Sequence, residues 1–310
     1  MRSEQLPHVG FIGLGVMGRP MARNLLQGGY RLTVHDLVGP AVDELVAWGA
    51  SRGGSPRDVA LACDVLITML PDSADVEAVF LGDDGALAGA RAGWLAIDMS
   101  SISPRVAREL SARVQAAGAE MLDAPVSGGD QGAIAGTLSI MVGGGEAAFA
   151  RALPILQMLG KTIVHVGPAG TGQVVKVCNQ VVVAGVIETV SEALVLGAKA
   201  GVDPRRIVDV LQGGLAATKL LEMRSSNILG GRYDPGFRVR LHLKDLKNAL
   251  ELAREAGVIL PVTVEVEQLM QRMRVAGRGD YDHSGLATVL EDLAGVRVCD
   301  VVAGASKETA

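Results

Sequence analysis

The sequence predicts an α/β fold, in which a doubly wound parallel sheet with helices on both faces is followed by an all-α domain. Short apolar runs alternate with amphipathic, helix-like segments up to about residue 167, and beyond it long helix-like segments replace the strand-like runs. A glycine loop also stands between the first apolar run and the first helical segment. We therefore expect a sheet domain at residues 1–167 and an all-helical domain at residues 168–310.

The strands of the first domain are expected at apolar runs separated by turn residues, namely "HVGFIG", "RLTVHD", "DVLITML", "WLAIDMS" and "AEMLDAP". Helices are expected from about Met17 to Gln27, over residues 40–48, and from a cap at Ser103 to a stop at Gly118. In the second domain, "GQVVKVCNQVVVAGVIETVSEALVLGAKAG" is rich in valine, but valine disfavours helix only weakly. Its length and its glycine stop favour one long helix.

Composition narrows the class of function. The 310 residues are 49% hydrophobic and 20% charged, which suffices for the cores of roughly two domains. A net charge of -5 without blocks of Lys and Arg argues against nucleic acid or an anionic membrane as partner. The 3 cysteines are far apart in the sequence, which predicts neither a disulfide framework nor a metal site and favours a reducing cytoplasm. No signal-peptide pattern precedes the first glycine loop, and the apolar run at 181–187 is too short to span a bilayer.

The segment "DAPVSGGDQGAIAGTLSIMVGG" at 123–144 is unusually rich in glycine. A flexible linker would have fewer apolar residues. Glycine loses more backbone entropy on folding than other residues, so such a run indicates close approach to a ligand or unusual backbone angles. Turns and packing are the expected roles of four of these glycines, Gly132, Gly136, Gly143 and Gly144.

The glycine loop "GLGVMG" has the G-x-G-x-x-G spacing, with Gly13, Gly15 and Gly18 between a strand and a helix. Such glycines permit a tight turn and let a pyrophosphate approach the helix N-terminus, which is typical of a Rossmann-type dinucleotide site. Asp36 ends the second expected strand, where its carboxylate can bind the adenosine ribose. A generic strand-turn-helix with an exposed aspartate is the alternative. Leu37 offers no positive charge to a 2'-phosphate, so NAD is favoured over NADP.

Motifs along nearly the whole chain resemble the β-hydroxyacid dehydrogenase family. The shared segments are "GFIGLGVMGRPMARNL" (10–25), "ITMLPDS" (67–73), "IDMSSISP" (97–104), the glycine-rich segment 123–144, "GTGQVVKVCNQ" (170–180), "GGLA" (213–216), "PGFRVRLHLKDLKNAL" (235–250) and "DHSGLA" (282–287). The resemblance implies an oxidoreductase that acts on a small carboxylate-bearing aldehyde or hydroxy acid. Its cofactor would be NAD, with NADP as the alternative. "NQ" at 179–180 and the "DHSGLA" segment favour the branch that reduces tartronate semialdehyde to glycerate.

The resemblance also implies the roles of individual residues. Lys176 and Asn179 would be catalytic, with Lys176 as general acid and Asn179 orienting it. The substrate carboxylate would be bound by Ser127, Gly128 and Gly129, with Gln180 as a further substrate contact. The cofactor would be bound by residues of the first glycine loop and at four later places, namely Gly13, Leu14, Gly15, Val16, Met17, Gly18, Asp36, Met69, Leu70, Pro71, Ser101 and Lys244.

Some residues of these motifs also have a purely structural interpretation. A helical lysine is usually solvated, but Lys176 stands among Val174, Val175 and Val177, where burial can prepare an ammonium for proton transfer. The charged run 238–247, which contains Lys244, is typical of a solvated helix face. A structural or substrate-gating role is expected for His283, and a core position for Cys178.

Other activities remain open within the family. They are oxidation of 3-hydroxyisobutyrate or another short 3-hydroxy acid, and reduction of succinic semialdehyde or glyoxylate. A dinucleotide-binding relative without hydroxyacid chemistry is disfavoured by the joint presence of Ser127, Lys176 and Asn179. The segment from Gln173 to Ala200 is apolar nearly all round, which predicts a homodimer or homotetramer formed through the helical half.

Overall fold

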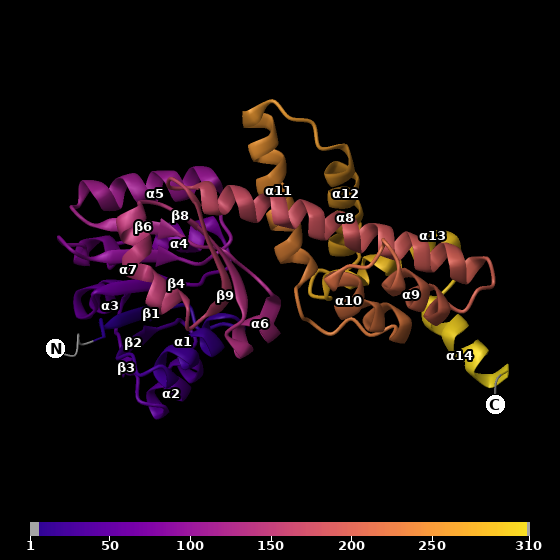
Figure 1. Cartoon of the computed structure of the whole chain (residues 1–310), viewed down its shortest axis with the longest axis horizontal. Coiled ribbons are helices and arrows are strands. Elements are labelled where there is room, and N and C mark those ends of the chain that lie inside the picture. Colours follow the sequence, from indigo (N-terminus) through magenta and orange to yellow (C-terminus); the bar gives the residue numbers. More distant parts are fainter. Residues whose placement is uncertain (1–5, 309–310) are drawn as a thin grey trace. The chain divides into compact units, whose positions relative to one another are not determined.

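A computed structural model of the chain describes residues 6–308, and side chains up to residue 305. The chain forms two compact units, one ending at Lys176 and the other beginning at Val177 (Figure 1). The division falls inside one helix, α8 (Thr171–Lys199). Because α8 belongs to both units, it is the element through which the chain passes from sheet to helices.

The first unit is built on a 9-stranded sheet. Its strands are β1 (Val9–Ile12), β2 (Leu32–His35), β3 (Ser51–Arg52), β4 (Val65–Thr68), β5 (Leu95–Asp98), β6 (Glu120–Asp123), β7 (Val126–Ser127), β8 (Leu138–Gly143) and β9 (Gly160–Gly167). They lie in the order β3-β2-β1-β4-β5-β6-β8-β7, with β9 beside β8. The first six strands are parallel, which confirms the doubly wound arrangement, since the order reverses at β1.

The glycine-rich segment 123–144 departs from an all-parallel sheet. It contains β7, a short helix α6 (Gly129–Ala135) and β8, and β8 pairs antiparallel with both β6 and β7. Gly136 ends α6 in the left-handed conformation, at φ 65°, where a side chain would be strained. Gly132 is packed against Leu138, so turn and packing roles hold for both glycines.

Helices cover both faces of this sheet (Figure 1). They are α1 (Gly18–Gln27), α2 (Gly39–Ala47), α3 (Pro56–Ala62), α4 (Ser73–Leu81), α5 (Pro104–Ala116) and α7 (Glu146–Leu156), with a 3-10 turn η1 (Ala86–Gly89). Alternate strand residues enter opposite cores: Phe11 belongs to a cluster that includes residues of α1, α2 and α7, and Leu66 to one that includes residues of α3, α4 and α5. Ser103 precedes α5 as expected, but its side chain makes no capping hydrogen bond; Pro104 alone marks the start.

The second unit is helical. Besides most of α8 it contains α9 (Pro204–Gly213), α10 (Lys219–Gly230), α11 (Val239–Ala256), α12 (Pro261–Val275), the 3-10 turn η2 (His283–Leu286), α13 (Ala287–Ala294) and α14 (Val298–Glu308). Its core has two clusters that share α8: Ile187 packs with α11 and α12, and Leu194 packs with α9, α10 and α14. The apolar run 181–187 therefore lies in the middle of this unit's central helix.

At 29 residues and a mean hydropathy of 1.9 over its most apolar window, α8 is long and apolar enough to cross a membrane by length and composition alone. The buried share of that window is 39%. The apolar run 181–187 is thus part of the longer apolar helix α8. Buried residues of α8 belong to both core clusters of the second unit.

Candidate active site

The loop between β1 and α1 requires glycine at two positions for packing and leaves the third open. A Cβ on Gly13, where φ is +95°, would lie 2.3 Å from the carbonyl oxygen of Met69, and one on Gly18 would lie 1.8 Å from that of Gly13. A Cβ on Gly15 would meet nothing within 4 Å. The loop therefore folds tightly while its central backbone, flanked by the exposed Val16, stays accessible to a ligand, which fits the pyrophosphate of a dinucleotide.

Asp36 lies directly after β2, beside this loop. Its Oδ2 accepts a hydrogen bond from the Leu14 N–H at 2.6 Å, and its Oδ1 accepts one from the Val38 N–H at 2.7 Å. Each carboxylate oxygen has a second lone pair, so Asp36 is oriented and can still accept from ribose hydroxyls. Leu37 is 97% exposed and adds no charge.

The other expected cofactor residues of the first unit lie at the same edge of the sheet. The carboxyl ends of β1, β4 and β5 are in register, with Ile12 beside Thr68 and Thr68 beside Asp98. Met69–Pro71 directly follow β4, and the Leu70 N–H donates to Ser100 Oγ at 2.9 Å. Ser101 follows on the same loop. The structure thus brings these segments to the carboxyl edge, where doubly wound sheets bind ligands.

The expected carboxylate-binding residues join β7 to α6. Ser127 is half-buried, and the two glycines after it have positive φ, 134° at Gly128 and 65° at Gly129. A Cβ on Gly129 would meet nothing within 4 Å. The backbone conformation therefore selects glycine at both positions, and the space beside the Gly129 Cα is open.

Sequence reasoning missed two buried carboxyls at this edge, Asp98 and Asp123, which are paired in register at the ends of β5 and β6. Asp98 Oδ1 accepts from Thr68 Oγ1 at 2.8 Å, while Oδ2 is buried without a partner among residues 6–308. Burial raises the pKa of each carboxyl to about 6, against opposing hydrogen bonds. The signal available in the sequence was an acidic residue at the end of an otherwise apolar strand.

On α8, Lys176 is buried, at 8% exposure, as its valine neighbours suggested. Asn179 is half-buried and three residues further on, hence on the same helix face. Cys178, between them, is exposed, so the expected core position is wrong. A rotation of about 100° per residue turns it away from the face that Lys176 and Asn179 share.

In the second unit, the expected polar residues form one connected network. Asn179 Nδ2 donates to Gln180 Oε1 at 2.8 Å, and Gln180 Nε2 donates to Asp245 Oδ2 at 2.6 Å. Lys244 Nζ lies 3.2 Å from Asp245 Oδ1. Lys244 is therefore mostly buried and ion-paired rather than part of a solvated face, whereas Arg238 and Arg240 of the same run pair with Asp280 at the surface.

A histidine pair extends this network. His242 Nε2 lies 3.3 Å from the Gln180 carbonyl oxygen, and His242 Nδ1 lies 3.1 Å from His283 Nδ1. Since a carbonyl only accepts, His242 Nε2 must donate; in the neutral pair His283 Nδ1 then donates to His242. Burial, and next the charge of His242, lower the pKa of His283 well below its usual value, so His283 is neutral. It is poorly suited to general acid duty.

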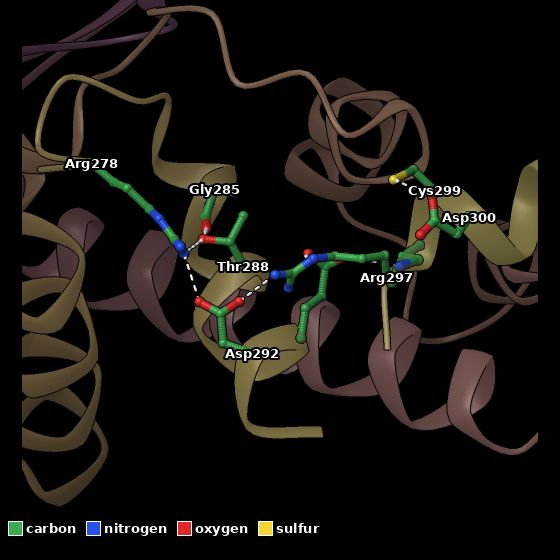
Figure 2. A network of polar contacts seen from close by, with 9 residues as sticks. Arg278, Gly285, Thr288, Asp292, Arg297, Cys299 and Asp300 are labelled. Carbon is green, nitrogen blue, oxygen red and sulfur yellow. Dashed lines mark hydrogen bonds and ion pairs between the residues drawn. The ribbon is translucent and has the colours of Figure 1, made fainter. Parts of the chain in front are cut away.

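The segment that carries His283 is pinned by a polar cluster drawn in Figure 2. Arg278 Nη1 donates to Thr288 Oγ1 at 2.8 Å and pairs with Asp292 at 3.0 Å, and Thr288 in turn donates to the Gly285 carbonyl at 2.7 Å. Arg297 binds the other oxygen of Asp292. These contacts fix η2 and α13.

No group of His, Cys, Asp and Glu within the described part of the chain could hold a metal ion.

Comparison with known proteins gives matches over nearly the whole chain. A family model for the NAD binding domain of 6-phosphogluconate dehydrogenase matches residues 8–167, and one described as NAD-binding of NADP-dependent 3-hydroxyisobutyrate dehydrogenase matches residues 170–290. The chain is 44% identical to a 2-hydroxy-3-oxopropionate reductase of Escherichia coli, covering 92% of this chain and 98% of that protein. It is 41% identical to a 3-hydroxyisobutyrate dehydrogenase of Pseudomonas aeruginosa, covering 90% and 95%. The structure of a 3-hydroxyisobutyrate dehydrogenase of Mycobacterium tuberculosis with L-serine superposes with a TM-score of 0.84 at 34% identity, covering 92% and 99%.

Proposed function

The chain belongs to the β-hydroxyacid dehydrogenase family, and on that basis we propose that it reduces tartronate semialdehyde (2-hydroxy-3-oxopropionate) to glycerate with NADH, reversibly. Its family makes it an NAD(P)-dependent oxidoreductase that acts on CH–OH groups. The choice of substrate within the family is the proposal.

One observation carries that choice: the two sequence features that favour the tartronate branch lie in one polar network, in which His242 contacts both His283 and the backbone carbonyl of Gln180, while the Gln180 side chain binds Asn179 and Asp245. Gln180 also links Asn179 to Asp245, which leaves the second N–H and the Oδ1 of Asn179 for a substrate. Tartronate semialdehyde has a hydroxyl at C2, where the aldehyde corresponding to 3-hydroxyisobutyrate has a methyl. A site of fixed polar groups favours the hydroxyl-bearing substrate, because the other leaves them unpaired.

The residues of the first unit fit a dinucleotide. The open backbone at Gly15 would take the pyrophosphate, Asp36 the adenosine ribose, and Met69–Pro71 with Ser101 the part of the cofactor that crosses the sheet edge. When bound, the nicotinamide supplies the hydride. Lys244 is proposed as a further cofactor contact.

Lys176 is proposed as the general acid. Its burial raises the free energy of a charged ammonium, which favours donation of a proton to the carbonyl oxygen as that oxygen becomes an alkoxide. In the oxidative direction the neutral amine takes the proton back. Asn179 would hold the same oxygen and orient the amine.

Ser127 and the backbone N–H groups of Gly128 and Gly129 are proposed to bind the substrate carboxylate. Charge-assisted hydrogen bonds from such donors orient a planar carboxylate and keep its carbon chain in a single pose. This contact requires a carboxylate near the reacting carbon, which short hydroxy acids and their aldehydes provide.

A substrate panel tests the proposal. Initial rates would be measured for tartronate semialdehyde, glyoxylate and succinic semialdehyde with NADH or NADPH, and for glycerate, 3-hydroxyisobutyrate and L-serine with the oxidised cofactors. We expect kcat/KM to be highest in the tartronate semialdehyde and glycerate pair. Gln180→Asn keeps the amide but is one methylene shorter. It should lower the ratio of kcat/KM for tartronate semialdehyde to kcat/KM for the other substrates. A higher kcat/KM for 3-hydroxyisobutyrate in the parent enzyme would contradict the assignment.

A further inference from the structure

The first turn of α8 is attached to the sheet of the first unit by Asp123, the last residue of β6. Asp123 Oδ1 accepts from the Gly170 N–H at 2.7 Å, and Oδ2 accepts from the Gln173 N–H at 2.9 Å. These amides belong to the start of a helix, where backbone N–H groups have no helical partner and a carboxylate is favoured by the helix dipole. Asp123 thus fixes where α8 begins.

Backbone packing places the same turn against the sheet. A Cβ on Gly172 would lie 2.5 Å from the carbonyl oxygens of both Asp123 and Met141, and one on Gly143 would lie 2.7 Å from the Gly172 N. Such distances exclude any side chain at these two positions without a shift of backbone. The first turn of α8 therefore sits in direct contact with β6 and β8, which explains why small residues occur on both sides.

Gln173 makes a second attachment, to the loop after β5. Its side chain is fully buried; Nε2 donates to the Ser100 carbonyl at 2.8 Å and Oε1 accepts from the Ile102 N–H at 3.1 Å. The two partners require this orientation of the amide, since the carbonyl only accepts and the N–H only donates. Gln173 therefore holds the backbone on both sides of Ser101.

We propose that Gln173, supported by Asp123, is a positioning residue for the reaction: it holds Lys176 at a fixed place relative to the Ser101 loop. Lys176 is three residues after Gln173, on the adjoining turn of α8. A shift of α8 along the sheet would move the acid but not the loop, and misplacement of about 1 Å is enough to cost roughly 100-fold in rate. The inference rests on the proposed function, which assigns the acid to Lys176 and a cofactor contact to Ser101.

The test uses the full-length enzyme and Gln173→Met, which keeps similar bulk and removes both side-chain hydrogen bonds. Gln115→Met, at an exposed position of α5, is the matched control. We expect kcat per folded enzyme to fall roughly 10- to 100-fold in Gln173→Met. We also expect the dissociation constant of NADH, measured by fluorescence titration without turnover, to rise several-fold, with neither value changed in the control. If Gln173→Met does not fold, Gln173→Asn, whose amide is one methylene too short to reach the loop, replaces it.

A double-variant cycle separates positioning from a general structural role. If Gln173 acts through Lys176, adding Gln173→Met to Lys176→Met should cause little further loss of kcat. An unchanged kcat in Gln173→Met, or a full additive loss in the double variant, would overturn the proposal. Should Lys176→Met alone keep near-normal turnover, the acid assignment of the proposed function has failed. The NADH dissociation constant of Gln173→Met then decides whether the attachment to the Ser101 loop stands.

Discussion

The backbone N–H of Leu14 donates to Asp36 Oδ2 over 2.6 Å, so the acid that directly follows β2 is held against the glycine loop that follows β1. The glycine loop and Asp36 are therefore held together in one fixed arrangement. A negative charge in this position attracts ribose hydroxyls and repels a 2'-phosphate.

We expect the double substitution Asp36→Asn with Leu37→Arg to move the preference from NADH toward NADPH. The Leu37 side chain is 97% exposed, so an arginine there can reach a phosphate without disturbing the fold. The ratio of kcat/KM for the two cofactors should change at least about tenfold, the value of one charge-assisted contact. Asp36→Asn with Leu37→Gln is the uncharged control. An unchanged ratio in the arginine variant would refute the role of Asp36.

Local pattern was enough to predict β1, β2, β4, β5, β6 and the glycine loop, because strand, turn and helix follow one another within a short stretch of sequence, but β3 and β9 were not predicted. The segment 123–144 was not predictable in the same way. Its glycines interrupt any period, and β8 is a strand through pairing with segments outside its own turn, mainly with β9 and at one position with β6. Ser103 shows a smaller limit, since the residue type suits a cap but the side chain makes no such bond.

Parts of the candidate site were hidden for a different reason, namely that they depend on contacts between distant residues. His242 and His283 meet across 41 positions, and Gln173 binds residues 71 and 73 positions earlier. Lys244 looked like a member of a solvated charged run because sequence spacing does not reveal that Asp245 is buried beside it. The role proposed for Gln173 therefore rests on its three-dimensional contacts and is tested by substitution.

Ser127→Ala should chiefly raise the apparent KM for the acidic substrate. The loss of one hydrogen bond to a charged group costs on the order of 1.5–3 kcal/mol, or about 10- to 100-fold in KM, while the proton donor is untouched. Steady-state kinetics at saturating NADH measure this, with Ser226→Ala at an exposed position of α10 as control. A fall in kcat with unchanged KM would assign Ser127 to the chemical step instead.

The helical unit is expected to mediate self-association. Val182 and Leu196 on α8 are 64% and 72% exposed, which is unusual for large apolar side chains on a central helix. Light scattering should give the mass of a dimer or tetramer, and Leu196→Glu should lower it by placing a charge in the apolar contact. A monomer in the parent protein at working concentration would contradict this expectation.

Stability should depend on pH through Glu188, which is 7% exposed on α8. Burial, followed by the charges of Glu192 and Glu265, raises the pKa of Glu188 from 4.5 to about 7. Between these values the native state binds more protons than the unfolded state, so stability falls as pH rises through that window. Glu188→Gln should therefore match the parent near pH 5 and exceed its free energy of unfolding by about 1–3 kcal/mol near pH 8.

Thermal denaturation of both proteins at the two pH values measures this difference. Glu222→Gln, at an exposed position of α10, should show no such dependence. If the advantage of Glu188→Gln were the same at pH 5 and pH 8, the carboxyl would not be titrating in this range.

Lys176→Met gives the most direct test of the chemistry. Methionine preserves most of the apolar stem that lies buried on α8 and removes the ammonium, so NADH should bind with a dissociation constant close to that of the parent. Turnover should fall by roughly 100-fold or more, the usual contribution of a general acid. Lys161→Met on the exposed side of β9 is the control and should leave both values unchanged. Ser127→Ala should thus chiefly raise KM, whereas Lys176→Met should chiefly lower kcat. If Lys176→Met turned over near-normally on the best substrate, the lysine would be structural. His242 would then have to be considered as the acid, because the lowered pKa of His283 keeps that imidazole neutral and leaves it no imidazolium proton to give.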